Sequence, residues 1–101
     1  MLIGQASDRT AALEAAHMQP DVILIELVLQ DESTLDFLPD LLRIAEGARV
    51  LVVTGETEAE AQVQAVRLGA VGVLQKTEPA SNLFKAIRKI HSGELWLRRA
   101  L

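Results

Sequence analysis

Short apolar runs and longer amphipathic stretches alternate four times along the chain, and this alternation limits the possible folds more than any other sequence feature. The apolar runs predict strands over Leu2–Ile3, Val22–Leu27, Arg49–Thr54 and Val71–Gln75. Each run is followed by a stretch in which apolar residues recur with the period of a helix. Parallel strands need crossover connections, and helices supply them. The sequence therefore predicts an α/β fold, an open parallel sheet of about four strands with flanking helices and right-handed crossovers.

Residues that cap or break helices locate the first two helices. Ser7 or Asp8 can accept hydrogen bonds from the first free N–H groups of a helix after the first strand. Ser33 or Thr34 can do the same for the second helix. Pro39 lies within the periodic stretch of this second helix, so the helix either begins late or bends. The positions expected on the buried faces are Ala12, Leu13, Ala16, Leu35, Leu38, Leu41, Leu42 and Ala45.

The last two helices have similar signals. Residues 57–60 have the spacing of a capping box, with a hydroxyl answered by a carboxylate three residues later. Pro79 suits the first position of the last helix, which Gly93 ends. The residues expected to pack inward are Ala59, Val63, Val66 and Ala70 in the third helix, and Leu83, Ala86, Ile87 and Ile90 in the fourth.

The composition excludes several classes of function. Half of the 101 residues are apolar and 24% are charged, which is typical of a globular domain, and we expect one domain over residues 1–101. A net charge of −4 and only three aromatic residues argue against direct nucleic-acid contact. The lack of cysteine excludes thiolate metal sites, and His17 and His91 are too scattered to indicate a histidine site. No apolar run is long enough for a membrane span, so we expect a cytoplasmic protein with no membrane contact.

Three polar residues follow or end neighbouring predicted strands. Glu26 interrupts the end of the second strand, Thr54 ends the third, and Lys76 follows the fourth. In open parallel sheets, ligands bind beyond the carboxyl ends of the strands. Two interpretations are open. The lysine and the glutamate form a structural ion pair, or the lysine and the threonine bind phosphoryl-like oxygens beside a carboxylate that is a nucleophile or metal ligand.

At these residues the chain resembles the response-regulator receiver domains of two-component systems. Residues 20–27 resemble their acceptor strand, residues 50–55 their hydroxyl-bearing strand, and residues 69–76 their lysine-bearing strand. Residues 83–87, followed by 93–97, resemble the closing helix and exit of receivers joined to a LuxR-type helix-turn-helix output domain. The resemblance implies a flavodoxin-like fold that here lacks its first strand and helix.

The resemblance also implies a degenerate phosphorylation site. In that family an aspartate accepts a phosphoryl group with the help of Mg²⁺, a hydroxyl side chain and a lysine. Thr54 and Lys76 match, but Glu26 stands at the acceptor position, and Val73 stands where an aromatic switch residue is usual. An extra methylene displaces the carboxylate by roughly a bond length, and misplacement of that size can cost ~100-fold in rate. The acidic metal-binding pair has no counterpart, which leaves Mg²⁺ too few oxygen ligands. We expect no enzyme activity, no phosphotransfer, and lost or weak Mg²⁺ binding.

Two functions follow from this resemblance. The first is a non-catalytic, receiver-like signalling or interaction module of a two-component transcription regulator. The alternative is a phosphorylatable receiver whose missing acidic pair and first strand come from a partner chain or a longer parent protein. In the first case, Glu26 either holds an active-like state with Thr54 and Lys76, or it merely neutralises Lys76.

The missing strand also limits the topology. In the family it lies between the first and second strands of this chain. Either the first strand fills that position, with spatial order 1-2-3-4, the first three helices on one face and the last on the other, or a second chain supplies the strand. In both cases one face loses a helix. The apolar surface left open predicts a homo-oligomer, most simply a dimer, with Leu83, Ile87 and Ile90 at its interface.

Overall fold

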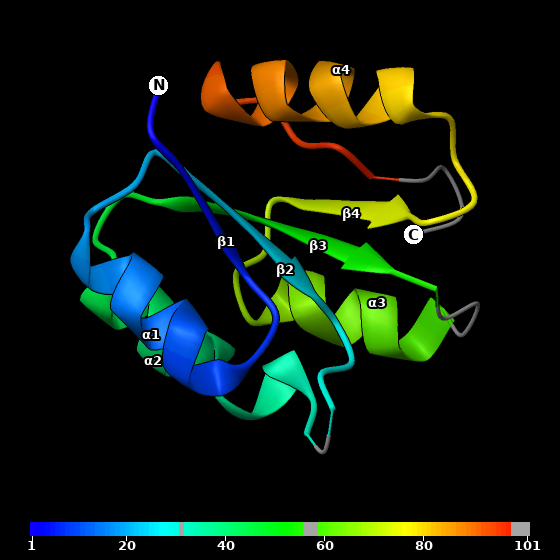
Figure 1. The fold of residues 1–101 in the computed structure, drawn as a ribbon. Helices are drawn as coiled ribbons and strands as arrows, with labels where there is room; N and C mark the ends of the chain where they lie inside the picture. Colours follow the sequence, from blue (N-terminus) through cyan, green and yellow to red (C-terminus); the bar gives the residue numbers. More distant parts are fainter. Residues whose placement is uncertain (31, 56–58, 98–101) are drawn as a thin grey trace.

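The computed structural model describes residues 1–30, 32–55 and 59–97 of the chain. Strands and helices alternate as the hydropathy pattern predicts (Figure 1). The elements in chain order are β1 (Ile3–Ala6), α1 (Arg9–His17), β2 (Val22–Glu26), the short 3-10 helix η1 (Thr34–Asp36), α2 (Leu38–Ile44), β3 (Arg49–Thr54), α3 (Ala59–Arg67), β4 (Gly72–Gln75) and α4 (Ala80–His91). The predicted parallel α/β fold is confirmed.

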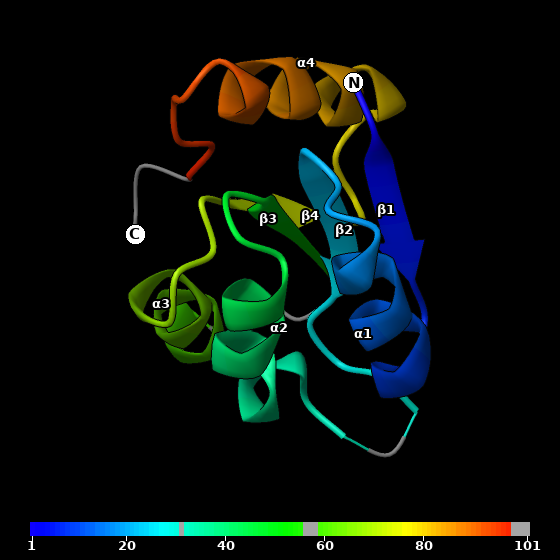
Figure 2. The same ribbon diagram turned by 90° about the vertical axis from the view of Figure 1, so that its left-hand side faces the viewer.

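The four strands form one parallel sheet in the order β1-β2-β3-β4. Strand β1 pairs directly with β2, with Ile3 opposite Val22. Helices α1, α2 and α3 cover one face of this sheet, and α4 lies alone on the other (Figures 1 and 2). Of the two topologies considered above, the structure has the one in which the first strand of this chain pairs with the second.

Two apolar clusters hold these layers together. The larger lies between the sheet and α1, α2 and α3, and its fully buried side chains include Ile23, Ile25 and Phe37. The smaller lies beneath α4, where Ile87 and Ile90 pack with Val22, Leu51 and Leu74. The prediction that Ile87 and Ile90 lie at an interface is wrong for the folded chain, because both side chains are buried against the chain's own sheet. Of the three predicted interface residues, only Leu83 is partly exposed.

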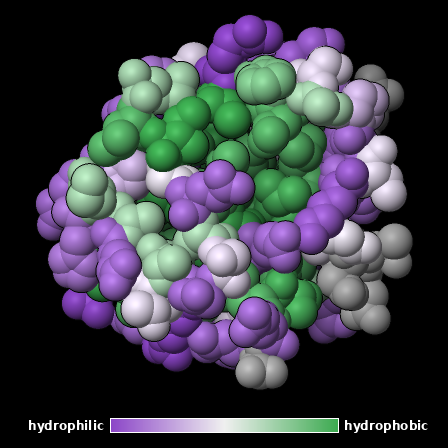
Figure 3. Space-filling view, viewed as in Figure 1, coloured by the Kyte–Doolittle hydropathy of each residue, from purple (hydrophilic) through white to green (hydrophobic). Residues whose placement is uncertain are grey.

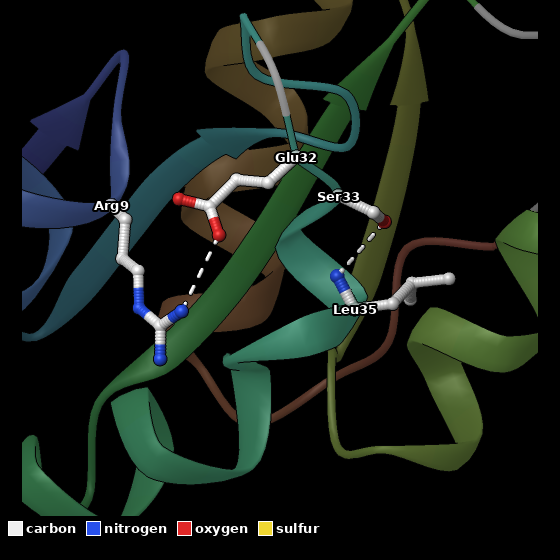
Figure 4. Close-up of polar contacts among 4 residues, drawn as sticks. All are labelled: Arg9, Glu32, Ser33 and Leu35. Carbon is white, nitrogen blue, oxygen red and sulfur yellow. Dashed lines mark hydrogen bonds and ion pairs between the residues drawn. The ribbon is translucent and has the colours of Figure 1, made fainter.

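The helix starts follow from local hydrogen bonds. Asp8 is the N-cap of α1, and its Oδ1 atom accepts a hydrogen bond of 2.8 Å from the N–H of Ala11. Ser33 caps η1 through a hydrogen bond of 3.1 Å from the N–H of Leu35 to its Oγ atom (Figure 4). Helix α2 then begins late, with Pro39 in its first turn, where the missing N–H costs nothing.

Three details differ from the prediction. The first strand covers Ile3–Ala6, because Leu2 lies just before it, and Pro79 is the N-cap of α4 instead of its first helical residue. In α3 the buried residues are Gln62 and Ala65, whereas Val63 and Val66 are only half-buried and Ala59 is exposed. The first two residues of the predicted capping box, at 57 and 58, lie outside the described residues.

The two edges of the sheet differ. After α4 the chain returns to the sheet, where Trp96 forms a parallel bridge with Gly72. The N–H of Trp96 donates to the carbonyl of Val71 (3.0 Å), and the N–H of Val73 donates to the carbonyl of Trp96 (2.9 Å). The β4 edge is therefore partly covered by the chain's own tail. Over the described residues, no segment pairs with the outer edge of β1.

Within the described residues, no helix has the length and apolar character needed to cross a bilayer.

Candidate functional site

The ends of three adjacent strands bring Glu26, Thr54 and Lys76 to one rim of the sheet. Glu26 is the last residue of β2, Thr54 is the last residue of β3, and Lys76 directly follows β4. The backbone sets their relative positions, because the N–H of Lys76 donates to the carbonyl of Thr54 over 2.8 Å. The rim is the one at which ligands bind in open parallel sheets.

Glu26 and Lys76 form an ion pair across the end of β3. The Nζ atom of Lys76 lies 2.7 Å from Oε1 of Glu26, and the two side chains are 49% and 47% exposed. Their strands are not neighbours, since β3 lies between them. The pair therefore spans the backbone at Val53, which is opposite Glu26 in the register. Solvent reaches both groups, so the pair is a site for charge complementarity more than a large source of stability.

A small pocket of about 90 Å³ gathers all three predicted residues. It is lined by Glu26, Thr54 and Lys76 together with Val28, Val53 and Gly55. The Thr54 side chain is almost fully buried. The pocket therefore has a carboxylate, an ammonium group and a hydroxyl-bearing residue in its wall, the three groups that the sequence predicted at this rim.

Two further residues, Thr34 and Glu78, stabilise this rim through hydrogen bonds. The sequence pattern does not single out either of them for the site. The hydroxyl of Thr34 donates to the backbone carbonyl of Glu26 and so ties η1 to the end of β2. The carboxylate of Glu78 accepts from the N–H of Gln75 (2.7 Å) and from the side chain of Asn82 (3.1 Å), which fixes the turn between β4 and α4. The only sequence signal for Glu78 is its position before a proline at a helix start.

A residue of α1, Arg9, holds the segment that follows β2 in place. Nη1 of Arg9 lies 3.4 Å from Oε2 of Glu32, and the Arg9 guanidinium also lies over the ring of Phe37, 5.3 Å from its centroid. Figure 4 shows Arg9 reaching across to Glu32 beside the Ser33 cap. One arginine thus links α1 to the segment that follows β2.

The described carboxylates around the rim each have a partner within the chain. Glu26 is paired with Lys76, Glu32 with Arg9, and Glu78 holds the turn before α4. Across residues 1–30, 32–55 and 59–97, no three His, Cys, Asp or Glu side chains gather at one place. Magnesium needs octahedral oxygen ligands, with carboxylates among them. Glu26, the carboxylate in the wall of the small pocket, already has a cationic partner in Lys76.

The predicted switch position lies in the middle of β4. Val73 is buried and pairs in register with Val52. The N–H of Val73 is the donor that binds the returning tail at Trp96. The Val73 side chain is apolar and almost fully enclosed.

A larger groove lies beside the ion pair on the α4 face. Its volume is about 630 Å³, and its walls include Gln5 of β1, Leu24 and Glu26 of β2, and Lys76 and Leu83 at the β4–α4 side. Figure 3 shows apolar side chains gathering on this face of the molecule, between α4 and the strands. The uncovered part of the sheet that the topology implied is therefore present in the structure.

Removing the ion pair is expected to change the stability only slightly. Glu26→Gln keeps the shape of the side chain without its charge, and exposed pairs contribute about 0.2–1 kcal/mol. Urea denaturation should show a loss within this range at low salt and a smaller one at high salt, because salt screens the pair. Glu32→Gln, which breaks the half-exposed pair with Arg9, is a matched control. A loss above about 2 kcal/mol at Glu26, near the values of buried pairs, would contradict this interpretation.

A family model and the curated relatives both match this chain to response regulators. The family model described as "Response regulator receiver domain" matches residues 1–88. The nitrate/nitrite response regulator protein NarL of Escherichia coli K12 is 31% identical over 101 residues, covering 99% of this chain and 47% of that protein. This chain spans about half the length of the curated relatives it matches.

Two solved structures share both fold and sequence with this chain. A response regulator from Burkholderia pseudomallei, determined with a phosphorylated aspartic acid, has a TM-score of 0.74 and 30% identity, covering 88% of this chain and 53% of that one. A LuxR family DNA-binding response regulator from Silicibacter pomeroyi has a TM-score of 0.71 and 30% identity, covering 94% of this chain and 70% of that one. The sheet and helices described above are therefore those of a flavodoxin-like receiver fold.

Proposed function

The chain belongs to the response regulator receiver domain family, with relatives of the LuxR type, and on that basis we propose that it is a receiver-like signalling module that acts without accepting a phosphoryl group. Receivers of this family are generally signalling domains and not enzymes. The proposal goes further, in that Glu26 replaces the acceptor aspartate and the site does not turn over.

The observation that carries this proposal is the ion pair between Glu26 and Lys76. The Lys76 ammonium group is 2.7 Å from the carboxylate of Glu26. A lysine at this rim would otherwise be available to a phosphoryl oxygen. Because its partner is part of the chain, the charge pairing at the rim does not depend on an incoming group. We propose that the module therefore presents one surface constantly.

The partners that the described carboxylates near the rim already have support the same conclusion. Phosphoryl transfer depends on positioning and on charge neutralisation by a metal ion. Here the carboxylates near the rim are engaged in an ion pair with Lys76, an ion pair with Arg9, and the turn before α4. We propose that Mg²⁺ binds weakly or not at all, and that neither a cofactor nor a metal takes part in the function.

The partners follow from the relatives. The solved Silicibacter relative is described as a DNA-binding response regulator of the LuxR family. We propose that this module acts with a helix-turn-helix output domain or another regulator in the cytoplasm, makes no direct contact with nucleic acid or membrane, and works as a homodimer. The sheet face left open beside α4 supports the dimer, because exposed apolar patches of this kind often mark interaction sites.

Incubation with a small-molecule phosphodonor and Mg²⁺, followed by intact-mass measurement, tests the proposal. No mass increase equal to one phosphoryl group is expected, because Glu26 is misplaced and paired with Lys76. The Burkholderia response regulator, which is known with a phosphorylated aspartic acid, is the positive control under identical conditions.

The Glu26→Asp variant separates two causes of the expected lack of labelling, the length of the side chain and the shortage of metal ligands. We expect Glu26→Asp to stay unlabelled as well, since shortening the side chain supplies no further metal ligand. Labelling of this variant alone would assign the loss to the length of the side chain. A stable phosphoryl adduct on Glu26 of the unaltered chain would overturn the proposal, and would favour a competent receiver completed by another chain or by a longer parent protein.

A further inference from the structure

We propose that two copies of this chain pair through the outer edges of their β1 strands, in antiparallel orientation, so that both sheets join into one continuous sheet. The proposal rests on the homodimer of the proposed function and specifies the interface, which the sequence alone placed beside α4. Four observations support it: the state of the two sheet edges, the direction of the β1 backbone groups, the side chains of β1, and the position of Gly4.

The outer edge of β4 is already partly paired with the chain's own tail. Trp96 bridges Gly72 there, through hydrogen bonds at Val71 and Val73. A second copy could pair at this edge only by displacing the tail. The indole of Trp96 also packs with the cluster beneath α4. Over the described residues, the β1 edge is therefore the one at which backbone groups have no strand beside them.

The backbone of β1 directs specific groups outward. The carbonyl of Leu2 points toward β2, because it accepts from the N–H groups of Asp21 (2.8 Å) and Val22 (3.3 Å). Successive residues of a strand direct their N–H and C=O groups to opposite edges. Ile3 and Gln5 therefore present theirs to the outer edge, where unpaired strand groups are a template for a further strand.

The side chains of β1 do nothing to block such pairing. Natural sheets protect an edge with charges, proline or a bulge. Residues 1–7 contain no charged side chain and no proline, and the first charge is at Asp8. The strand is regularly paired with β2 from Ile3 to Ala6. Ile3 is 41% exposed although it lies beside Val22, on the same sheet face as α4.

The outward groups of β1 are self-complementary about Gly4. In an antiparallel pair with a two-fold axis at Gly4, Ile3 of one copy lies opposite Gln5 of the other, and each such pair exchanges two hydrogen bonds. The two Gly4 residues then face each other as a pair without hydrogen bonds, the closest spacing in a sheet, with Cα atoms about 4.5 Å apart. A two-fold axis repeats the contact, so the interface closes at two copies.

Light scattering of edge variants tests the interface. The unaltered chain is expected to have the mass of a dimer at high micromolar concentration. Gln5→Pro removes an outward N–H that no strand of the described residues pairs with, and proline is tolerated at the outer side of an edge strand. This variant should have the mass of a monomer and a circular dichroism spectrum like that of the unaltered chain. Gln5→Thr keeps the N–H and is the matched control, which should remain a dimer.

A cross-link locates the contact without relying on the fold of the proline variant. The chain has no cysteine, so one can be placed at a single position. Ile3→Cys and Gln5→Cys chains are mixed and oxidised, and a cross-linked product joining one of each is expected to exceed the product from either chain alone. A mixture of Ile3→Cys with Val28→Cys, an exposed position beyond the other end of the strands, should give little product.

The results of these experiments distinguish a failure of the β1 interface from a failure of the proposed function. A dimer that survives Gln5→Pro and gives no cross-link between positions 3 and 5 overturns the β1 interface and leaves the homodimer standing. A monomeric unaltered chain overturns the interface and the homodimer together. Neither result changes the phosphodonor measurement, which tests the rest of the proposed function independently.

Discussion

Replacement of Phe37 by alanine is expected to lower the free energy of unfolding by about 3–5 kcal/mol, the usual loss for a buried phenylalanine. The ring is fully buried in the cluster that joins the sheet to α1, α2 and α3. It lies between η1 and α2, and the guanidinium of Arg9 rests over it at 5.3 Å from its centroid. The substitution therefore leaves a cavity and also removes the surface on which Arg9 is held.

Urea and thermal denaturation of Phe37→Ala measure this loss, and each kcal/mol corresponds to about 4–8 °C for a domain of this size. Phe84→Ala is the matched control, because Phe84 is 62% exposed on the outside of α4. Its effect should lie within about 0.5 kcal/mol. Equal effects at the two positions would show that Phe37 does not anchor the larger cluster.

Replacement of Gly69 by alanine is expected to cost about 2–4 kcal/mol, from two separate causes. Gly69 connects α3 to β4 with a φ of +118°, which side-chain-bearing residues rarely adopt. A Cβ atom there would also lie only 2.5 Å from Cδ1 of Leu42. Leu42 must then leave its position against the larger cluster. The strain and the displaced leucine together destabilise the fold.

A double-mutant cycle separates these causes. Gly93→Ala has the same backbone problem, with a φ of +98°, but no non-neighbouring atom of the described residues lies within 4 Å of its Cβ position. It should cost only the strain, about 1–2 kcal/mol. Combining Gly69→Ala with Leu42→Ala should cost less than the sum of the two single changes, since the shortened side chain no longer collides. Strict additivity would show that the crowding at Leu42 has no energetic effect.

The fold could be predicted because its signals are local. The third strand was predicted with the bounds that the structure has, Arg49–Thr54, since its run of apolar residues is bounded by polar ones. Pro39 predicted either a late start or a bend, and the late start was realised. The buried face of α3 was not predicted well. Hydropathy favours Val63 and Val66, but the packed helix turns Gln62 and Ala65 inward, and no hydropathy scale selects a glutamine.

The positions of the site residues could be inferred for a simple geometric reason. Parallel strands end at one rim, so polar residues at three strand ends, such as Glu26, Thr54 and Lys76, come together whatever the loops do. The supporting contacts depend on how the loops fold. The hydroxyl of Thr34 donates to a backbone carbonyl across a loop, and the carboxylate of Glu78 accepts from a backbone N–H of its own turn. Such contacts have no periodic pattern in the sequence, so only the three-dimensional structure reveals them.

The strand order has a kinetic consequence. Every strand pairs only with the strands that precede and follow it in the chain. Each new pairing therefore closes a loop no longer than one helix and its connections, which keeps the entropic cost of each step small. Such sequential growth favours rapid folding, because distant parts of the chain need not meet first. During synthesis, β1 and β2 can already pair while β4 is still being translated, so that the sheet assembles in the direction of translation.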